Sequence, residues 1–158
     1  MVASVTPKGL NRLLYFSCFS AAFPRGEEAQ AEEVDSIIRA SIRNNRARAI
    51  TGLLLVHQDW FMQALEGPGQ AVLDTYQRIL GDSRHQGAQV IAAGPAESRL
   101  FGDWNMCARR VSDIDDAILA GLRMKGDFDP GRLTAVSGLG LLTAVRGTQA
   151  RAMAARAG

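Results

Sequence analysis

The sequence predicts an α+β fold in which two helices cover one face of a mixed or antiparallel sheet. Two observations carry this prediction. Apolar runs of strand length alternate with two stretches whose apolar residues recur at helical spacing, in the order β-α-β-β-α-β-β. The chain has 158 residues, of which 47% are hydrophobic and 22% charged, so it is long enough to bury one continuous core.

The first strand and the first helix come from the N-terminal part of the chain. Residues 13–19 (LLYFSCF) form an apolar, aromatic-rich run of strand length, and a loop containing proline and glycine follows it. From about Ala31 apolar residues recur at helical spacing, with glutamates near the start of the helix and arginines near its end. We expect Asn44 and Asn45 to close this helix.

A hairpin, a second helix and two further strands complete the pattern. The apolar runs 50–56 (ITGLLLV) and 60–67 (WFMQALEG) are separated by three polar residues, which predicts an antiparallel hairpin. A second helix opens at Pro68, a strand follows over 89–99, and residues 103–111 supply a last strand. Because the run 50–56 is apolar almost throughout, we expect it in the interior of the sheet.

The C-terminal part of the chain does not continue this pattern. Aspartates precede a short predicted helix at 114–122, and the apolar segment 133–145 (LTAVSGLGLLTAV) predicts a helical appendage whose final ten residues fray. Residues 131–158 carry four arginines and no acid, whereas residues 1–130 carry 14 basic and 16 acidic side chains. The positive charge therefore belongs to a tail, which argues against a nucleic-acid-binding domain.

The cysteines and the hydrophobic runs give no sign of a metal site, a secretion signal or a membrane span. Cys18 and Cys107 lie far apart and have neither metal-ligand nor redox-pair spacing. No apolar run reaches signal-peptide or membrane-span length. We therefore expect a cytoplasmic protein that does not contact a membrane.

Several polar residues have ordinary structural explanations when each is taken alone. Tyr15 in the first strand fits a core aromatic residue with a hydrogen-bonded hydroxyl. Gln63 lies in an apolar strand, where a buried amide without partners would cost about 1–3 kcal/mol. Two polar pairs that end the predicted helices would ordinarily be a helix cap and the surface residues of a turn: Asn44 with Asn45, and Arg84 with His85.

Together, these residues predict a site for a flat ligand. The space between two helices on an open sheet is a natural slot for a planar ring. Such a ring would meet the amides of Asn45 and Gln63 and the cationic donors of Arg84. An isoalloxazine ring needs this set, since its O2, O4 and N5 accept hydrogen bonds and its N3–H donates one. Three further side chains project from the helix faces that could sandwich it: Ile37, Ser41 and Ile79.

Six segments in the right order resemble the successive motifs of the BLUF family, sensors of blue light using FAD. They are LLYFS (13–17), Asn44-Asn45, ITGLLL (50–55), FMQALEGPG (61–69), ILGDSRH (79–85) and FGDWNM (101–106). The resemblance covers roughly residues 12–110 and implies a ferredoxin-like α+β domain that binds FAD non-covalently, with FMN or riboflavin as alternative flavins. It divides the chain into an N-terminal extension (1–11), the flavin-binding domain (12–110) and a C-terminal helical cap with a basic tail (111–158).

The resemblance also implies a role for each matching residue. Tyr15 would donate an electron and a proton to the photoexcited flavin, and Gln63 would bridge that tyrosine to N5 and O4 of the ring. Asn45 would bind the O4 and N3 edge of the flavin, and Arg84 and His85 would bind its O2 side and the ribityl chain. Asn44 and Ser41 would line the pocket. Trp104 and Met106 would compete to approach Gln63 and relay the signal.

This chain departs from the usual family pattern at two places. The loop between Tyr15 and the first helix is longer than usual, and Ala64 follows the glutamine where some members carry a bulky aromatic residue. The longer loop bears on how the ligand reaches the site, and the small residue bears on the rate at which the dark state recovers. Neither change removes a group that the photochemistry needs.

The resemblance implies a short, stand-alone photoreceptor that is not an enzyme. We expect no effector domain after residue 110, and signalling through an unidentified downstream regulatory protein by a homodimer or higher homo-oligomer. The C-terminal helices would bury the sheet face opposite the flavin, and light would reposition residues 113–145. Two alternatives are a small α+β hydrolase and a nucleic-acid-binding module, but the sequence lacks a glycine-rich anion loop and its strands are apolar.

Overall fold

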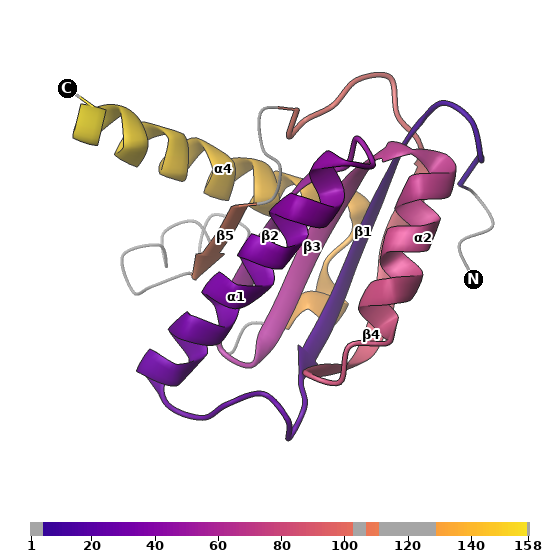
Figure 1. Cartoon of the computed structure of the whole chain (residues 1–158). Coiled ribbons are helices and arrows are strands. Elements are labelled where there is room, and N and C mark those ends of the chain that lie inside the picture. Colours follow the sequence, from indigo (N-terminus) through magenta and orange to yellow (C-terminus); the bar gives the residue numbers. More distant parts are fainter. Residues whose placement is uncertain (1–4, 103–106, 111–128, 158) are drawn as a thin grey trace.

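The computed structural model describes residues 5–102, 107–110 and 129–157 (Figure 1). Five strands form one sheet in the spatial order β4-β1-β3-β2-β5. The strands are β1 (Leu10–Phe19), β2 (Thr51–His57), β3 (Trp60–Pro68), β4 (His85–Pro95) and β5 (Cys107–Arg110). The helices within the described ranges are α1 (Glu27–Arg46), α2 (Gly69–Leu80), α4 (Ala135–Ala157) and a short 3-10 helix, η2 (Pro130–Arg132).

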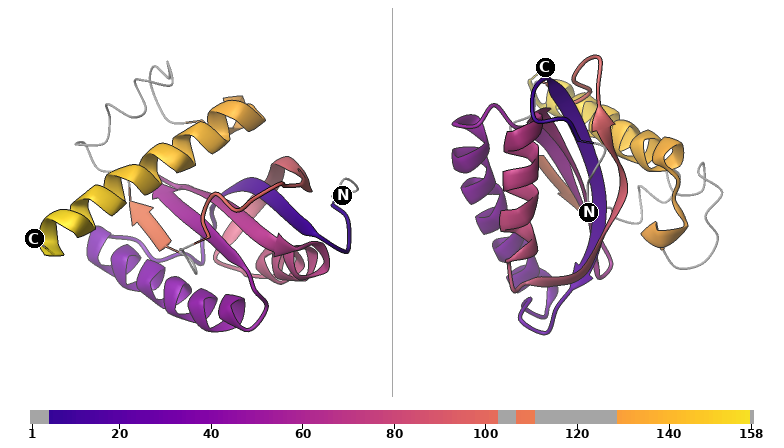
Figure 2. Two further views of the ribbon diagram at one scale, coloured as in Figure 1. Left: turned by 90° about the horizontal axis from the view of Figure 1, so that it is seen from above. Right: turned by 90° about the vertical axis from the view of Figure 1, so that its right-hand side faces the viewer.

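The strand pairing confirms the predicted α+β fold. β1 pairs antiparallel with both β3 and β4, and β2 pairs antiparallel with β3 across a tight turn at Gln58, where φ is 52°. β5 runs parallel to β2, so β2 lies inside the sheet as expected. α1 and α2 cover one face of the sheet, and α4 crosses the other (Figures 1 and 2). The result is a ferredoxin-like arrangement with an additional helical layer.

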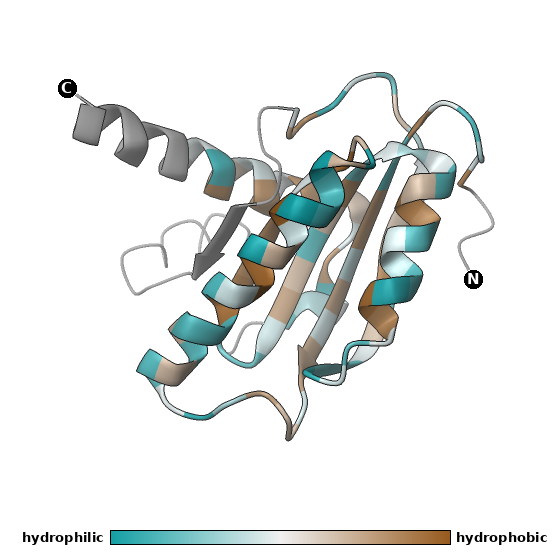
Figure 3. Cartoon of the chain, in the orientation of Figure 1, coloured by the Kyte–Doolittle hydropathy of each residue, from teal (hydrophilic) through white to brown (hydrophobic). Residues whose placement is uncertain are grey.

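Alternation along the strands divides the buried side chains into two apolar layers, because successive residues of a strand point to opposite faces. Leu13 and Tyr15 of β1 belong to the layer beneath α1 and α2. Leu14 and Phe16 belong to the layer beneath α4. In Figure 3 most of α1 is teal, with brown segments at intervals, and the strands beneath the helices carry further brown segments. The central strands β1, β2 and β3 are therefore buried on both faces, whereas several residues of the edge strand β4 are exposed.

α4 closes the second layer, as the apolar segment 133–145 predicts. Leu141, Leu142 and Val145 are almost completely buried against the sheet. Gly138 allows this close approach, since a Cβ atom there would lie 2.9 Å from a methyl group of Leu14. The residues expected to cap the sheet face opposite the two-helix layer do so.

The bounds of α1 differ from the sequence prediction at both ends. α1 begins at Glu27 rather than Ala31, because glutamates in its first turn complement the positive end of the helix dipole. It ends at Arg46, so Asn44 and Asn45 lie within the last turn instead of closing the helix. The side chain of Asn45 is consequently buried rather than serving as a surface cap.

Several other elements also differ from the prediction or lie outside the described residues. β4 begins at His85 instead of residue 89, because the polar residues 85 and 86 pair with the end of β1. α4 continues to Ala157, through residues expected to fray, and its alanine-rich end has high helix propensity. Of the predicted strand 103–111 the structure describes Cys107–Arg110, and the short helix predicted at 114–122 lies outside the described residues.

No helix within the described ranges combines the length and the apolar character that crossing a membrane would require.

Candidate ligand-binding site

A cleft of about 200 Å³ lies between α1 and α2, above the sheet face that they cover. Its lining includes nine of the residues that the sequence predicts for the site: Tyr15, Ile37, Ser41, Asn44, Asn45, Gln63, Ile79, Arg84 and His85. The structure thus brings together side chains from β1, α1, β3, α2 and the start of β4. The two predicted relay residues, Trp104 and Met106, lie outside the described residues.

The wall formed by the sheet is built around a tyrosine–glutamine pair. Tyr15 of β1 lies directly opposite Gln63 of β3 in the strand register, and both side chains point to the α1 and α2 face. The hydroxyl of Tyr15 donates a hydrogen bond to Oε1 of Gln63. The ring of Tyr76 packs on that of Tyr15, with 5.2 Å between their centroids. The pair is almost fully buried, with 3% and 4% of the two residues exposed.

Burial fixes the protonation state of this tyrosine. Removal from water raises the pKa of Tyr15 far above its ordinary value of 10.0, and the neighbouring Tyr76 and Asp82 raise it further. The side chain is therefore a neutral phenol that keeps its proton on the hydrogen bond to Gln63.

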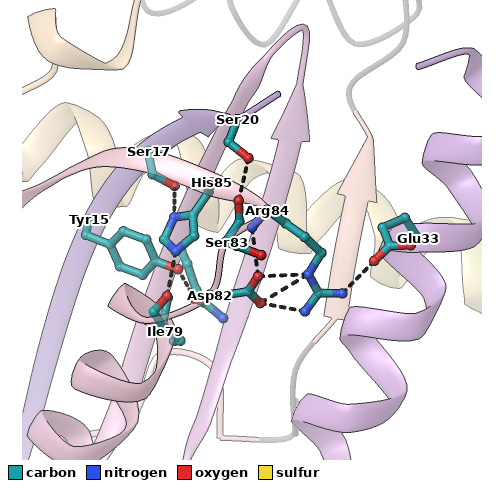
Figure 4. A network of polar contacts seen from close by, with 10 residues as sticks. Tyr15, Ser17, Ser20, Glu33, Ile79, Asp82, Ser83, Arg84 and His85 are labelled. Atoms are coloured by element: carbon teal, nitrogen blue, oxygen red, sulfur yellow. Dashed lines mark hydrogen bonds and ion pairs between the residues drawn. The ribbon is translucent and has the colours of Figure 1, made fainter. Parts of the chain in front are cut away.

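His85 is held by both of its ring nitrogens (Figure 4). Nε2 lies 2.5 Å from the carbonyl oxygen of Ile79, and Nδ1 lies 2.8 Å from the hydroxyl of Ser17. A carbonyl oxygen only accepts, so Nε2 carries a proton, and in the neutral ring Nδ1 accepts from the hydroxyl of Ser17. The ring also lies edge-on to Phe61. His85 therefore presents ring carbon surface to the cleft, while its nitrogens bind the protein.

Arg84 joins the two helices that border the cleft. Its guanidinium contacts Asp82 at 2.5–3.1 Å, within the turn between α2 and β4, and reaches Glu33 of α1 at 2.7 Å (Figure 4). The hydrogen bonds from Arg84 hold the pKa of Asp82 below its ordinary value. A guanidinium has five N–H donors, so Arg84 can hold both carboxylates and still donate to a ligand in the cleft.

The cleft also contains residues that the sequence prediction missed. Phe61 lies two residues before Gln63 on the same strand face, and Leu54 is the cross-strand partner of Gln63. Strand alternation could therefore have identified both Phe61 and Leu54. Thr75 lies one helical turn before Ile79, and Asp82 belongs to the turn that carries Arg84. Three more lining residues complete the set: Ser17, the last residue of the LLYFS segment, and Ala40 and Arg78.

The lining residues fit a flat ring with hydrogen-bonding edges. Amide groups of Asn45 and Gln63 and the guanidinium of Arg84 match ring carbonyls and ring nitrogens, and Ile37 and Ile79 supply apolar surface. Thr75 adds a buried hydroxyl oxygen for which the described part of the chain supplies no hydrogen-bond partner. Within the same ranges no group of three or more His, Cys, Asp or Glu side chains could hold a metal ion.

Comparison with known sequences places residues 10–107 within the profile of "BLUF: Sensors of blue-light using FAD". The chain is 29% identical over 105 residues to the photoactivated adenylate cyclase subunit alpha of Euglena gracilis, covering 66% of this chain and 10% of the relative. It is 30% identical over 105 residues to the subunit beta of Euglena longa, covering 66% and 12%. The chain thus spans about a tenth of the length of these curated relatives.

Comparison with solved structures also finds light-regulated and BLUF proteins. The dark-state structure of BlrB, a BLUF protein, is 26% identical with a TM-score of 0.72, covering 91% of this chain and 99% of that one. A bacterial light-regulated adenylyl cyclase is 30% identical with a TM-score of 0.63, covering 72% and 33%. The photo-activated state of BlsA, at 20% identity, a TM-score of 0.75 and 85% and 93% coverage, is similar in fold.

Proposed function

Because the chain belongs to the BLUF family of sensors of blue light using FAD, we propose that blue light switches it by rearranging the Tyr15–Gln63 hydrogen bond. The observation that carries this proposal is the buried pair on the wall of the cleft, where the phenol donates to the amide carbonyl. When bound, FAD supplies blue-light absorption and an excited state that accepts an electron and a proton.

Tyr15 is the donor in this proposal. Its raised pKa keeps the phenol neutral in the dark, and the hydrogen bond gives the proton a path toward Gln63. The electron and the proton return to Tyr15 in the recovery step, so the net chemistry is zero. What remains is a Gln63 amide that has rotated or tautomerised and has exchanged its hydrogen-bond partners. The chain is then a switch between two states rather than a catalyst.

The remaining residues of the cleft would hold the flavin ring. Asn45 would bind its O4 and N3 edge, and Arg84 would bind its O2 side through donors that its two carboxylate partners leave available. Ile37 and Ile79 would pack on the faces of the ring, and His85 would contribute ring surface near the ribityl chain. Ser41 and Asn44 line the same wall. FMN and riboflavin share this ring system and would bind in the same way.

The change at Gln63 would be transmitted to the α4 side of the sheet. Gln63 lies between Met62 and Ala64, whose side chains face α4. We extend the proposal to Trp104 and Met106, which lie shortly before β5 in the sequence, as the residues that respond to Gln63 and reposition residues 113–145. The output would be a changed contact with a downstream regulatory protein, made by a homodimer or higher homo-oligomer without catalytic activity of its own.

An absorption spectrum of the purified full-length chain tests this function. We expect the bands of an oxidised flavin, a small shift to longer wavelength under blue light, and a return to the starting spectrum in the dark. The physical reason is that a new hydrogen bond to O4 stabilises the excited state more than the ground state. A colourless chain that takes up no added FAD, or a flavin-loaded chain whose spectrum ignores light, would contradict the proposal.

A further inference from the structure

Thr75 has an unusual environment for a helical threonine. Its residue is 2% exposed, it lines the cleft between α1 and α2, and its Oγ1 has no hydrogen-bond partner among the described residues. Buried polar side-chain atoms almost always have a partner, so an orphaned hydroxyl on a residue that lines a cavity calls for an explanation. It is the one buried side-chain oxygen or nitrogen within the described ranges that lacks a partner.

A second threonine of this chain shows what the usual solution looks like. A threonine within a helix commonly donates its hydroxyl to the carbonyl four residues earlier. Thr143 of α4 does so, with 2.7 Å between its Oγ1 and the carbonyl oxygen of Leu139. Thr143 is exposed and could bind water instead, yet it makes this bond. Thr75 is buried and could not turn to solvent, yet its hydroxyl makes no such bond.

The position of Thr75 points to the ligand as its partner. Thr75 of α2 lines the same cleft as the tyrosine–glutamine pair of the sheet, and the next residue, Tyr76, packs its ring on Tyr15. Two other polar side chains of the cleft are already bound by the protein, since both nitrogens of His85 are engaged and Arg84 holds two carboxylates. The Thr75 hydroxyl is uncommitted, and it can both donate and accept.

We propose that Oγ1 of Thr75 hydrogen-bonds to the polar edge of the flavin ring, which makes Thr75 a flavin-binding residue. This inference rests on the proposed function, because it names one more contact in the same site. It gives the orphaned hydroxyl the partner that the protein does not provide. It also predicts opposite effects in the flavin-free and flavin-loaded states when the hydroxyl is removed.

Thr75→Val tests both states, because valine keeps the branched shape of threonine and lacks its hydroxyl. Without flavin, removal of an unpartnered buried hydroxyl should leave the thermal unfolding midpoint unchanged or raise it. With flavin, the lost hydrogen bond should raise the dissociation constant by about two- to tenfold. Loss of a contact to the ring should also displace the dark absorption band, which a purely structural role of Thr75 would not do.

The experiment compares the full chain with Thr75→Val, Thr75→Ser and the matched control Thr143→Val. The flavin-loaded proteins are diluted, and the fluorescence of the released flavin gives the dissociation constant for FAD and for riboflavin separately. We expect weaker binding of both flavins by the same factor in Thr75→Val, because both contain the ring. Thr75→Ser retains a hydroxyl and should bind almost as the unchanged chain does, and Thr143→Val should bind as tightly as the unchanged chain.

Three results would overturn the contact, and they differ from failure of the proposed function. Equal dissociation constants for Thr75→Val and the unchanged chain would show that the hydroxyl contributes nothing to binding. Weak binding by Thr75→Ser as well would assign the effect to shape rather than to the hydroxyl. Weaker binding of FAD with unchanged binding of riboflavin would move the contact from the ring to the nucleotide tail. If the unchanged chain takes up no flavin at all, the proposed function itself is wrong.

Discussion

Tyr15 and Gln63 have properties that neither side chain would have at the surface. The phenol is buried beside Tyr76, so its ionised form is strongly disfavoured and its proton stays on the hydrogen bond. The amide is buried on the sheet wall of the cleft, so any rotation must exchange one set of partners for another instead of drifting through water. In the proposed switch, the buried donor and the buried amide would therefore have two discrete arrangements.

The raised pKa of Tyr15 predicts how stability depends on pH. Between the ordinary value of 10.0 and the higher folded value, the unfolded chain loses this proton and the folded chain keeps it. The free energy of unfolding should therefore be unaffected by Tyr15 up to about pH 9, and should fall above pH 10 by up to about 1.4 kcal/mol per pH unit. Denaturant unfolding of the full chain between pH 8 and pH 11 measures this fall.

Tyr15→Phe supplies the control for that measurement, because it removes the titrating group and keeps the ring. The variant should lose stability less steeply above pH 10, and the remaining fall belongs in part to Tyr76, whose pKa burial also raises. An alkaline slope as steep in Tyr15→Phe as in the unchanged chain would contradict the assignment of a raised pKa to Tyr15.

At the scale of elements, one chain of ion pairs ties the two sides of the cleft together. Glu33 of α1 binds Arg84, and Arg84 binds Asp82 in the turn that follows α2. Glu33 lies one helical turn before Ile37 on α1, and Asp82 and Arg84 both line the cleft. The ion pair between Arg84 and Glu33 is partly exposed, with 29% and 32% of the two side chains accessible, so salt should weaken it.

Glu33→Gln should therefore let flavin leave faster. We expect the dissociation rate of flavin from the full chain to rise about two- to fivefold at low salt, which is the range for a partly exposed ion pair. Added salt should speed release from the unchanged chain and should have much less effect on the variant. Stopped-flow fluorescence of released flavin measures both rates.

Glu32→Gln is the matched control for this prediction. Glu32 is the exposed neighbour of Glu33 on the same helix, and its replacement changes the net charge by the same amount. Release rates that rise equally in Glu32→Gln and Glu33→Gln would attribute the effect to net charge. Unchanged rates in Glu33→Gln would mean that the ion pair does not restrain the flavin.

For the whole molecule, the sequence predicted the sheet and the position of the site better than it predicted the contacts within the site. Apolar runs and turn residues predict the order of strands and helices because these features depend on neighbouring residues. The engagement of His85 by Ser17 depends on the pairing of β1 with β4, far apart in the chain, and so could not be predicted. Thr75 was missed because a polar residue on a helix looks the same in sequence whether it is exposed or buried.

Sequence patterns also predict the ends of helices less well than the order of helices and strands. The glutamates before Ala31 suit either a loop or the first turn of a helix, and the packing of α1 on the sheet decides between them. The buried position of Asn45 follows from the continuation of α1 to Arg46, which the asparagine pair alone does not predict. The segment 133–145 was predictable as a cap because its apolar residues needed a surface to cover.

The three layers together suggest how one hydrogen bond could affect the far side of the molecule. β1 and β3 carry Tyr15 and Gln63 toward the cleft, and their neighbours Leu14, Phe16 and Met62 pack under α4. A change in the backbone of β3 at Gln63 would therefore reach the α4 layer through residues directly beside it. This coupling requires that light alter Gln63 in the first place.

The most direct test is the light-minus-dark infrared difference spectrum of the FAD-loaded chain beside that of Tyr15→Phe. In the unchanged chain we expect a reversible fall in the stretching frequency of the flavin C4=O group, because a new hydrogen bond to O4 weakens that bond. Tyr15→Phe should bind FAD and show no such fall, since it lacks the donor. An equal fall in Tyr15→Phe, or no fall in a fully loaded unchanged chain, would contradict a switch built on Tyr15 and Gln63.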